Sequence, residues 1–312
     1  METSIGACMN DVKLFDRVLD RLGLPVRPPV DLDALRDIYA AWCLSVPFDN
    51  IAKLIALHSD TDTPLPGIDA HEFFERWLDH GAGGTCWPTS NALCELLLHL
   101  GFDARRVAGS MRDTGYVGHG SVKVRIASQD WLVDSSLLTD IPLPLTNDIF
   151  IATESVFGVE VEPADGTHVI WADLPPYPTM IPCRLLVDPT DHDFYVERYE
   201  ASRIRSPFNQ RLYARRNRVG ERIVLDGNTW HVKSAGGLET RILDRSELLA
   251  CLINEFGISR TLVSQANTSG ALDASFEPPP SPPIPYLTRE QPSRRQRPSI
   301  YGPTADELWG SG

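Results

Sequence analysis

The sequence predicts an α+β fold, in which helices and strands occupy different stretches of the chain. Three observations predict it. Residues 1–101 carry helical periodicity, short strand-like stretches begin at about residue 102, and strands and a helix mix over residues 221–257. A doubly wound sheet would instead alternate single strands with single helices.

Four stretches in the first hundred residues have the apolar spacing of amphipathic helices. Asp31 is placed to cap the second helix, and Gly81 and Gly101 supply the ends of the third and fourth. The predicted helices cover residues 11–22, 31–44, 71–81 and 91–100.

After residue 102 the apolar residues alternate or form short β-branched runs, which is typical of strands. A late helix over residues 245–257 has Asp244 or Ser246 as its cap. The predicted strands cover residues 102–110, 120–126, 130–136, 168–174, 183–188, 221–227 and 228–234.

The amino-acid composition excludes several classes of binding partner and site. A net charge of −13 argues against a general nucleic-acid or anionic-membrane binder, although it leaves room for a local basic pocket. The six cysteines form no CxxC pair, so we expect reduced thiols and no metal site. No run approaches the roughly 18 apolar residues of a membrane span. The segment METSIGACMND has no apolar signal core, so we expect a cytoplasmic protein.

Cys86 is the candidate nucleophile. It follows Gly83 and Gly84, which permit a sharp turn, and it stands where a helix is about to begin. Backbone N–H groups at a helix start favour a thiolate. The alternative is a small apolar residue that only packs.

A thiolate needs a base and a group that orients the base. His119, 33 residues after Cys86, lies between glycines before a strand, and Asp134 follows 15 residues later. A hairpin between the intervening strands brings Asp134 close to His119. Each residue alone is more often structural, but the ordered set is much more specific.

At this point the chain resembles the arylamine N-acetyltransferase family, within the papain- and transglutaminase-like cysteine enzymes. The resemblance covers about residues 12–260 and is carried by the following segments. They are LRDIYAAWCLSVPFDNI (35–51), GGTC (83–86), the His119–Asp134 spacing, DFYVERYEASRIRSPF (193–208), the Leu-x-Gly turn at 225–227, and ELLACLINEFGI (247–258).

The resemblance implies a domain organisation. It comprises a helical domain with the nucleophile over 1–101, a β-barrel domain with His and Asp over 102–205, and an α/β lid over 206–270. Residues 271–312 form a Pro-rich tail that we expect to be disordered, because nine of the 25 prolines lie between 278 and 303. A ligand for a proline-recognising module is the alternative for the tail.

The resemblance also implies a ping-pong N-acyltransferase with a Cys86–His119–Asp134 triad. No cofactor is held tightly; acyl-CoA or an acyl-carrier-protein thioester is the co-substrate, and a small-molecule amine is the acceptor. The candidates for substrate contact are Trp87, Gly118, Ser135, Ser136 and Phe208.

The chain departs from the family pattern Arg-Gly-Gly-x-Cys-x-Glu-x-Asn. It has Ala82, Pro88 and Ser90 at the Arg, Glu and Asn positions. Larger residues also replace small glycines after Asp134. These changes favour an acyl group larger than acetyl, as in the formation of natural-product amides.

Two rival functions stay open. One is a hydrolase or cyclase that uses the same acyl-cysteine, and the other is a degenerate family member that only binds.

The basic segment 203–222 also has two interpretations. It is either a solvated strand face or a patch that binds coenzyme A phosphates or an acidic carrier protein.

Overall fold

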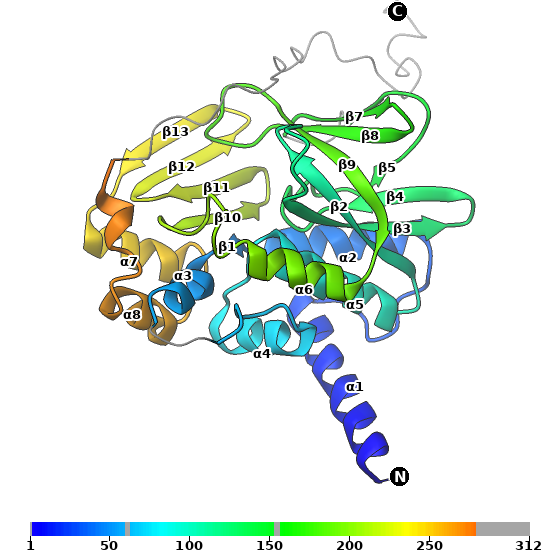
Figure 1. Ribbon diagram of the computed structural model, residues 1–312, viewed down its shortest axis with the longest axis horizontal. Coiled ribbons are helices and arrows are strands. Elements are labelled where there is room, and N and C mark those ends of the chain that lie inside the picture. Colours follow the sequence, from blue (N-terminus) through cyan, green and yellow to red (C-terminus); the bar gives the residue numbers. More distant parts are fainter. Residues whose placement is uncertain (1, 60–62, 153–156, 279–312) are drawn as a thin grey trace, which may run out of the picture.

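The computed structural model describes residues 2–59, 63–152 and 157–278, and these form two sheets with the helices gathered along one side of them (Figure 1). The prediction of an α+β fold is confirmed. Most of the predicted Pro-rich tail, from residue 279 on, lies outside the described residues.

The larger sheet has eight strands in the order β5-β4-β3-β2-β9-β8-β7-β6 and curls into a barrel-like form (Figure 1). Its neighbouring strands are antiparallel, and β2 pairs with β9 although β3 to β8 lie between them in the sequence. The strands are β2 (Asp103–Met111), β3 (His119–Ile126), β4 (Gln129–Val133), β5 (Leu143–Pro144), β6 (Phe150–Ile151), β7 (Val159–Ala164), β8 (Thr167–Ala172) and β9 (Ile181–Thr190).

The smaller sheet has five strands in the order β1-β10-β11-β12-β13. Its first strand comes from the N-terminal part of the chain, so this sheet joins the two ends of the sequence. The strands are β1 (Phe48–Asp49), β10 (Tyr213–Arg218), β11 (Glu221–Asp226), β12 (Thr229–Ser234) and β13 (Gly237–Ile242).

The helices lie mainly on one side of these sheets, the lower side in Figure 1. They are α1 (Glu2–Leu22), α2 (Leu32–Ser45), α3 (Ile51–Leu57), α4 (Ala70–His80), α5 (Cys86–His99), α6 (His192–Ala201), α7 (Arg245–Asn254) and α8 (Arg260–Thr268), with a short 3₁₀ turn at Asp273–Phe276.

The predicted helix ends are confirmed where the signal is local. The Asp31 side chain accepts the N–H of Ala34 at 2.9 Å, and Asp244 forms a capping box with Glu247. Gly81 ends α4 in the left-handed conformation that glycine adopts without strain. By contrast, α5 begins five residues earlier than predicted, at Cys86 itself.

Three large hydrophobic clusters hold the described part of the chain together, and a small fourth one forms around Trp171. The first joins α1, α2, α4 and α5 to the near strands of the barrel, and the second fills the barrel. The third lies between the five-stranded sheet and helices α3, α7 and α8. Ala271 and Leu272 are buried in this third cluster, so the chain stays packed beyond residue 270, where the tail was expected to begin.

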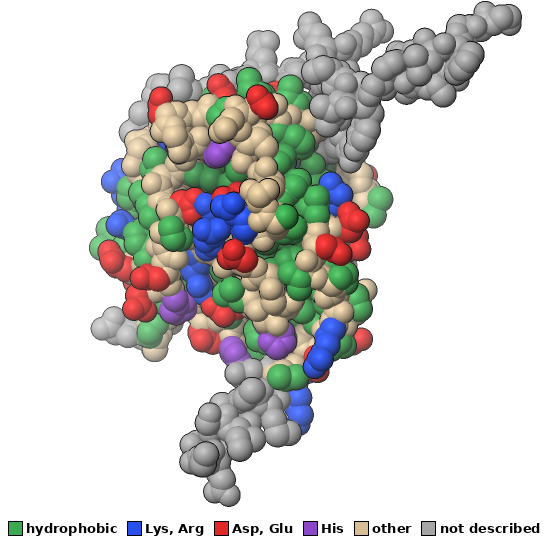
Figure 2. Space-filling model, turned by 90° about the vertical axis from the view of Figure 1, so that its right-hand side faces the viewer, with side chains coloured by type: hydrophobic (Ala, Val, Ile, Leu, Met, Phe, Trp, Pro, Cys, Tyr) green, Lys and Arg blue, Asp and Glu red, His purple; other side chains and the backbone are tan. Residues whose placement is uncertain are grey.

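Basic and acidic side chains stand beside one another on the barrel side of the molecule (Figure 2). On β3 and β4, Lys123 and Arg125 pair with Asp130, and Lys123 also pairs with Asp188. Among the described residues, no helix is long and apolar enough to cross a membrane.

Candidate active site

Cys86 is the first residue of α5, and crowding explains the two glycines before it. A Cβ at Gly83 would lie 1.8 Å from the Pro47 carbonyl oxygen, and one at Gly84 would lie 2.9 Å from Pro88 Cγ. The first contact overlaps a backbone atom, so the turn that presents Cys86 requires glycine at position 83. At position 84 a side chain would require the Pro88 ring to shift.

Asp49 fixes this turn from the neighbouring strand. Its Oδ2 accepts the Gly83 N–H at 2.7 Å, its Oδ1 accepts the Ile51 N–H at 3.1 Å, and its own N–H donates to the Gly84 carbonyl at 3.1 Å. Burial raises the pKa of Asp49 to about 6, although the charge of Arg76 acts in the opposite direction. The sequence analysis did not select Asp49.

His119 and Asp134 are joined by a buried hydrogen bond. The β3–β4 pairing, with Val122 opposite Val133, brings the start of one strand beside the end of the other. His119 Nε2 donates to Asp134 Oδ2 at 2.7 Å, and the two residues are 3% and 1% exposed. The hairpin predicted from the sequence is therefore present, and it brings these two residues together.

The pKa values of His119 and Asp134 shift in opposite directions. Burial by itself lowers the pKa of His119, but the Asp134 carboxylate raises it well above the usual value. Burial by itself raises the pKa of Asp134, but the His119 charge and the N–H groups of Ser136 and Leu137 lower it. The pair therefore favours an imidazolium and a carboxylate.

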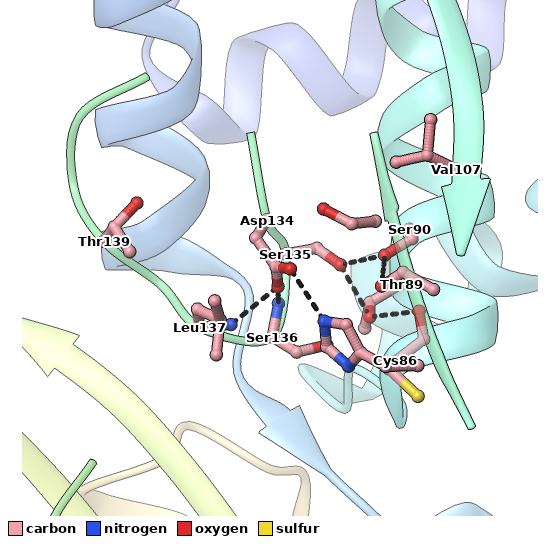
Figure 3. Close-up of polar contacts among 12 residues, drawn as sticks. Cys86, Thr89, Ser90, Val107, Asp134, Ser135, Ser136, Leu137 and Thr139 are labelled. Carbon is pink, nitrogen blue, oxygen red and sulfur yellow. Dashed lines mark hydrogen bonds and ion pairs between the residues drawn. The ribbon is translucent and has the colours of Figure 1, made fainter. Parts of the chain in front are cut away.

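Further bonds hold Asp134 in place (Figure 3). Its Oδ1 accepts the N–H groups of Ser136 at 2.9 Å and Leu137 at 2.8 Å. The buried Tyr39 hydroxyl donates to the Asp134 carbonyl at 2.7 Å, and it accepts the N–H groups of Asp134 and Thr139. One phenol on α2 therefore closes the loop that follows β4.

Cys86, the first residue of α5, lies beside this histidine. Its thiol lies 3.7 Å from the Gly118 carbonyl, next to His119 in the chain, and a Cys86–His119 side-chain hydrogen bond contributes to the raised pKa of His119. The structure thus brings Cys86, His119 and Asp134 together, with Nδ1 of the imidazole left free of the carboxylate.

The other selected residues differ in their surroundings. Trp87 packs edge-on against Tyr195 of α6, with ring centroids 4.9 Å apart. Phe208 lies beside Phe48, at 5.1 Å between centroids. Ser136 is 3% exposed, and its hydroxyl has no hydrogen-bond partner.

The residues that depart from the family pattern have their own partners. Ala82 packs in the apolar core under the five-stranded sheet, where an arginine would not fit without loss of that packing. Ser90 Oγ donates to the Gly120 carbonyl and bonds to Ser135 Oγ, each at 2.8 Å, and Ser135 also bonds to Thr89. A chain of hydroxyl groups therefore ties α5 to the loop after Asp134.

The sequence analysis also missed Lys53 of α3. This lysine is buried, and its ammonium donates to Ser202 Oγ at 2.8 Å. Burial lowers its pKa to about 8, and the charge of a Cys86 thiolate acts on it in the opposite direction. Nothing in the local sequence marks a lysine in an apolar helix as buried.

In the basic segment 203–222, the alternative of a solvated strand face does not hold at two positions. Arg215 and Arg222 are both buried. Arg222 donates to the carbonyls of Leu138 and Asp173, so it joins the five-stranded sheet to the barrel.

Comparison with known proteins places the chain among related sequences. A family model described as N-acetyltransferase matches residues 31–263. An arylamine N-acetyltransferase of Mycolicibacterium smegmatis is 28% identical over 228 residues, covering 70% of each chain. Proansamycin X synthase of Amycolatopsis mediterranei is 27% identical over 121 residues, covering 37% of this chain and 45% of the synthase.

The fold has known counterparts. The structure of Mycobacterium marinum arylamine N-acetyltransferase in complex with CoA superposes with a TM-score of 0.70 at 20% identity. The superposition covers 84% of this chain and 97% of that one. At this level of identity, the match establishes the fold.

Proposed function

Because this chain belongs to the arylamine N-acetyltransferase family, we propose that it is a thioester-dependent N-acyltransferase that works through an acyl-cysteine on Cys86. The observation that carries the proposal is the buried His119–Asp134 pair beside Cys86 at the start of α5. A thiol next to an oriented imidazole is the arrangement that nucleophilic acyl transfer needs.

The first half-reaction forms the acyl-enzyme. The Cys86 proton passes to His119, and the sulfur attacks the carbonyl carbon of the thioester. The new C–S bond forms as the old one breaks, and the leaving thiolate takes the proton from the imidazolium. Backbone N–H groups at the start of α5, which have no acceptor within the helix, are suited to hold the oxyanion.

The second half-reaction transfers the acyl group to an amine. The amine nitrogen attacks the acyl-cysteine, His119 takes its proton, and the Cys86 sulfur leaves. Asp134 keeps the imidazole oriented and stabilises its charged form in both steps. The thioester is a co-substrate in this scheme, and no tightly held cofactor takes part.

We further propose that the donor carries an acyl group larger than acetyl, on coenzyme A or a carrier protein. Larger residues after Asp134 and the partial similarity to Proansamycin X synthase support this. The test is the ratio of kcat/KM for acetyl-CoA against longer acyl thioesters with one amine. A preference confined to acetyl-CoA contradicts a larger donor and leaves the acyltransferase proposal intact.

Product analysis separates transfer from hydrolysis. The enzyme is incubated with a thioester, with and without an arylamine, and free thiol, free acid and amide are quantified. Transfer predicts that thiol release rises with amine and that the amide accounts for it. Equal release without amine, with free acid as the product, supports a hydrolase instead.

A further inference from the structure

Arg215 of β10 is a buried cation without an acceptor. It is 4% exposed, its Nε has no hydrogen-bond partner, and it forms no ion pair with any described residue. The ring of Phe48 lies 5.6 Å from its guanidinium carbon. Burying a charge in this way is costly unless something pairs with it.

The position of Arg215 connects it to the candidate active site. It is the strand partner of Phe48 in β1, and Phe48 bridges Gly84, two residues before Cys86. Two residues further along the same face of β10, Asn217 donates to the carbonyl of Leu138, in the loop after Asp134. Arg215 therefore lies between the turn that carries Cys86 and the loop that carries Asp134.

Ser136 in that loop supplies a second unused donor. Its N–H is bonded to Asp134, but its buried hydroxyl has no partner. Neighbouring cations have partners: the buried Arg222 donates to backbone carbonyls, and the half-buried Lys233 pairs with Asp173. The Arg215 guanidinium and the Ser136 hydroxyl are therefore two buried groups of this region whose Nε and Oγ have no hydrogen-bond partner.

We propose that Arg215, together with Ser136, recognises a carboxylate carried by one of the two substrates. A guanidinium presents paired N–H donors that match the two oxygens of a carboxylate. The carboxylate belongs either to the acyl group, as in a dicarboxylic monothioester, or to the amine, as in an aminobenzoate. This assignment of a specificity-determining residue rests on the proposed acyltransferase function.

Matched substrate pairs test the proposal. Acetyl-CoA is compared with succinyl-CoA using aniline, and aniline with 4-aminobenzoate using acetyl-CoA. We expect the wild type to prefer one carboxylate member by about tenfold or more in kcat/KM, the size of one charge-assisted bidentate interaction. Arg215→Met should abolish that preference, and the responding pair identifies the substrate that carries the carboxylate.

The control variant is Arg218→Met on the same strand. Arg218 pairs with Glu221 and Glu255 at the surface, so its loss should leave the preference unchanged. Three results overturn the proposal: no carboxylate preference in the wild type, a preference that survives in Arg215→Met, or an equal rise in KM for both CoA donors. The last result would assign Arg215 to the coenzyme A phosphates.

A binding measurement separates this inference from the proposed function. Calorimetry measures the binding of succinate and of benzoate without any turnover. The parent protein is Cys86→Ala, and it is compared with the double variants that also carry Arg215→Lys or Arg215→Met. We expect one carboxylate to bind, more weakly with lysine and not detectably with methionine. If neither anion binds the parent variant, the proposal is wrong even where acyl transfer occurs. If an anion binds but no thioester acylates Cys86, the acyltransferase proposal fails instead.

Discussion

The Nε2 of His119 donates to Asp134 Oδ2 at 2.7 Å, and both side chains are almost fully buried. A buried pair of this kind fixes which ring nitrogen carries the proton, because the carboxylate accepts only from a protonated nitrogen. The other nitrogen is then available to Cys86. Through this bond, Asp134 at the end of a barrel strand orients the imidazole that is proposed to act on Cys86 at the start of α5.

Asp134→Asn should lower the rate of Cys86 acylation by about a thousandfold or more, because an amide favours the wrong tautomer of His119. The Asn Oδ1 can still accept the N–H groups of Ser136 and Leu137, so the fold should persist. Single-turnover release of the thiol measures the effect. Asp165→Asn is the control, since its side chain is 97% exposed. A loss below tenfold would contradict the role given to Asp134.

Tyr39→Phe should lower the free energy of unfolding by about 1–3 kcal/mol, because removal of the hydroxyl takes away the acceptor of two buried backbone N–H groups, those of Asp134 and Thr139. Urea denaturation measures this. Tyr116→Phe, at a position that is 37% exposed, should change little. Equal effects of the two variants would show that the Tyr39 hydroxyl does not hold the loop.

Gly83→Ala should destabilise the turn before Cys86 by about 1–3 kcal/mol or more, because its Cβ would overlap the Pro47 carbonyl oxygen. Gly236→Ala is the matched control, since its Cβ would meet only Ser234 Oγ at 3.5 Å. The thermal unfolding temperature and the rate of Cys86 acylation should both be lower in Gly83→Ala than in Gly236→Ala. Indistinguishable behaviour would mean that the turn tolerates a side chain.

Asp49 should give the folding stability a distinctive pH dependence. Its pKa is about 6 in the folded chain against an ordinary value of 3.8, so the folded state holds the extra proton between these values. The contribution of Asp49 to the free energy of unfolding is therefore greatest at low pH. It falls as pH rises toward 6, by up to about 1.4 kcal/mol per pH unit.

The variant Asp49→Asn does not titrate, so it isolates this contribution. The stability of the wild type relative to the variant should decline between pH 4 and pH 6, the interval set by the two pKa values, and level off above it. Denaturant unfolding across this interval provides the measurement. Parallel curves for the two proteins would show that Asp49 does not carry the raised pKa.

Much of the fold was predictable because its signals are local. Asp31 and Asp244 cap helices through bonds to residues three positions away, and Gly81 ends α4 through its own backbone conformation. The association of His119 with Asp134 was also predictable, because it needs only one short hairpin.

Other elements gave no readable pattern. α6 buries only Tyr195 and Tyr199 fully, which is too little to show a helical period, and every residue of β13 is exposed. Arg215 and Lys53 are buried by segments far away in the sequence, whereas a charged side chain is ordinarily solvated. Their environment depends on how β1, β10 and α3 pack together, which no local rule supplies.

The intact mass of the protein after incubation with acyl thioesters tests the central claim most directly. We expect a mass gain equal to one acyl group, lost again on addition of an amine and absent from Cys86→Ala. Peptide mapping should place the group at Cys86 and at none of the other five cysteines. A protein that gains no mass from any coenzyme A or carrier-protein thioester, or gains it equally in Cys86→Ala, would contradict acyl transfer through Cys86.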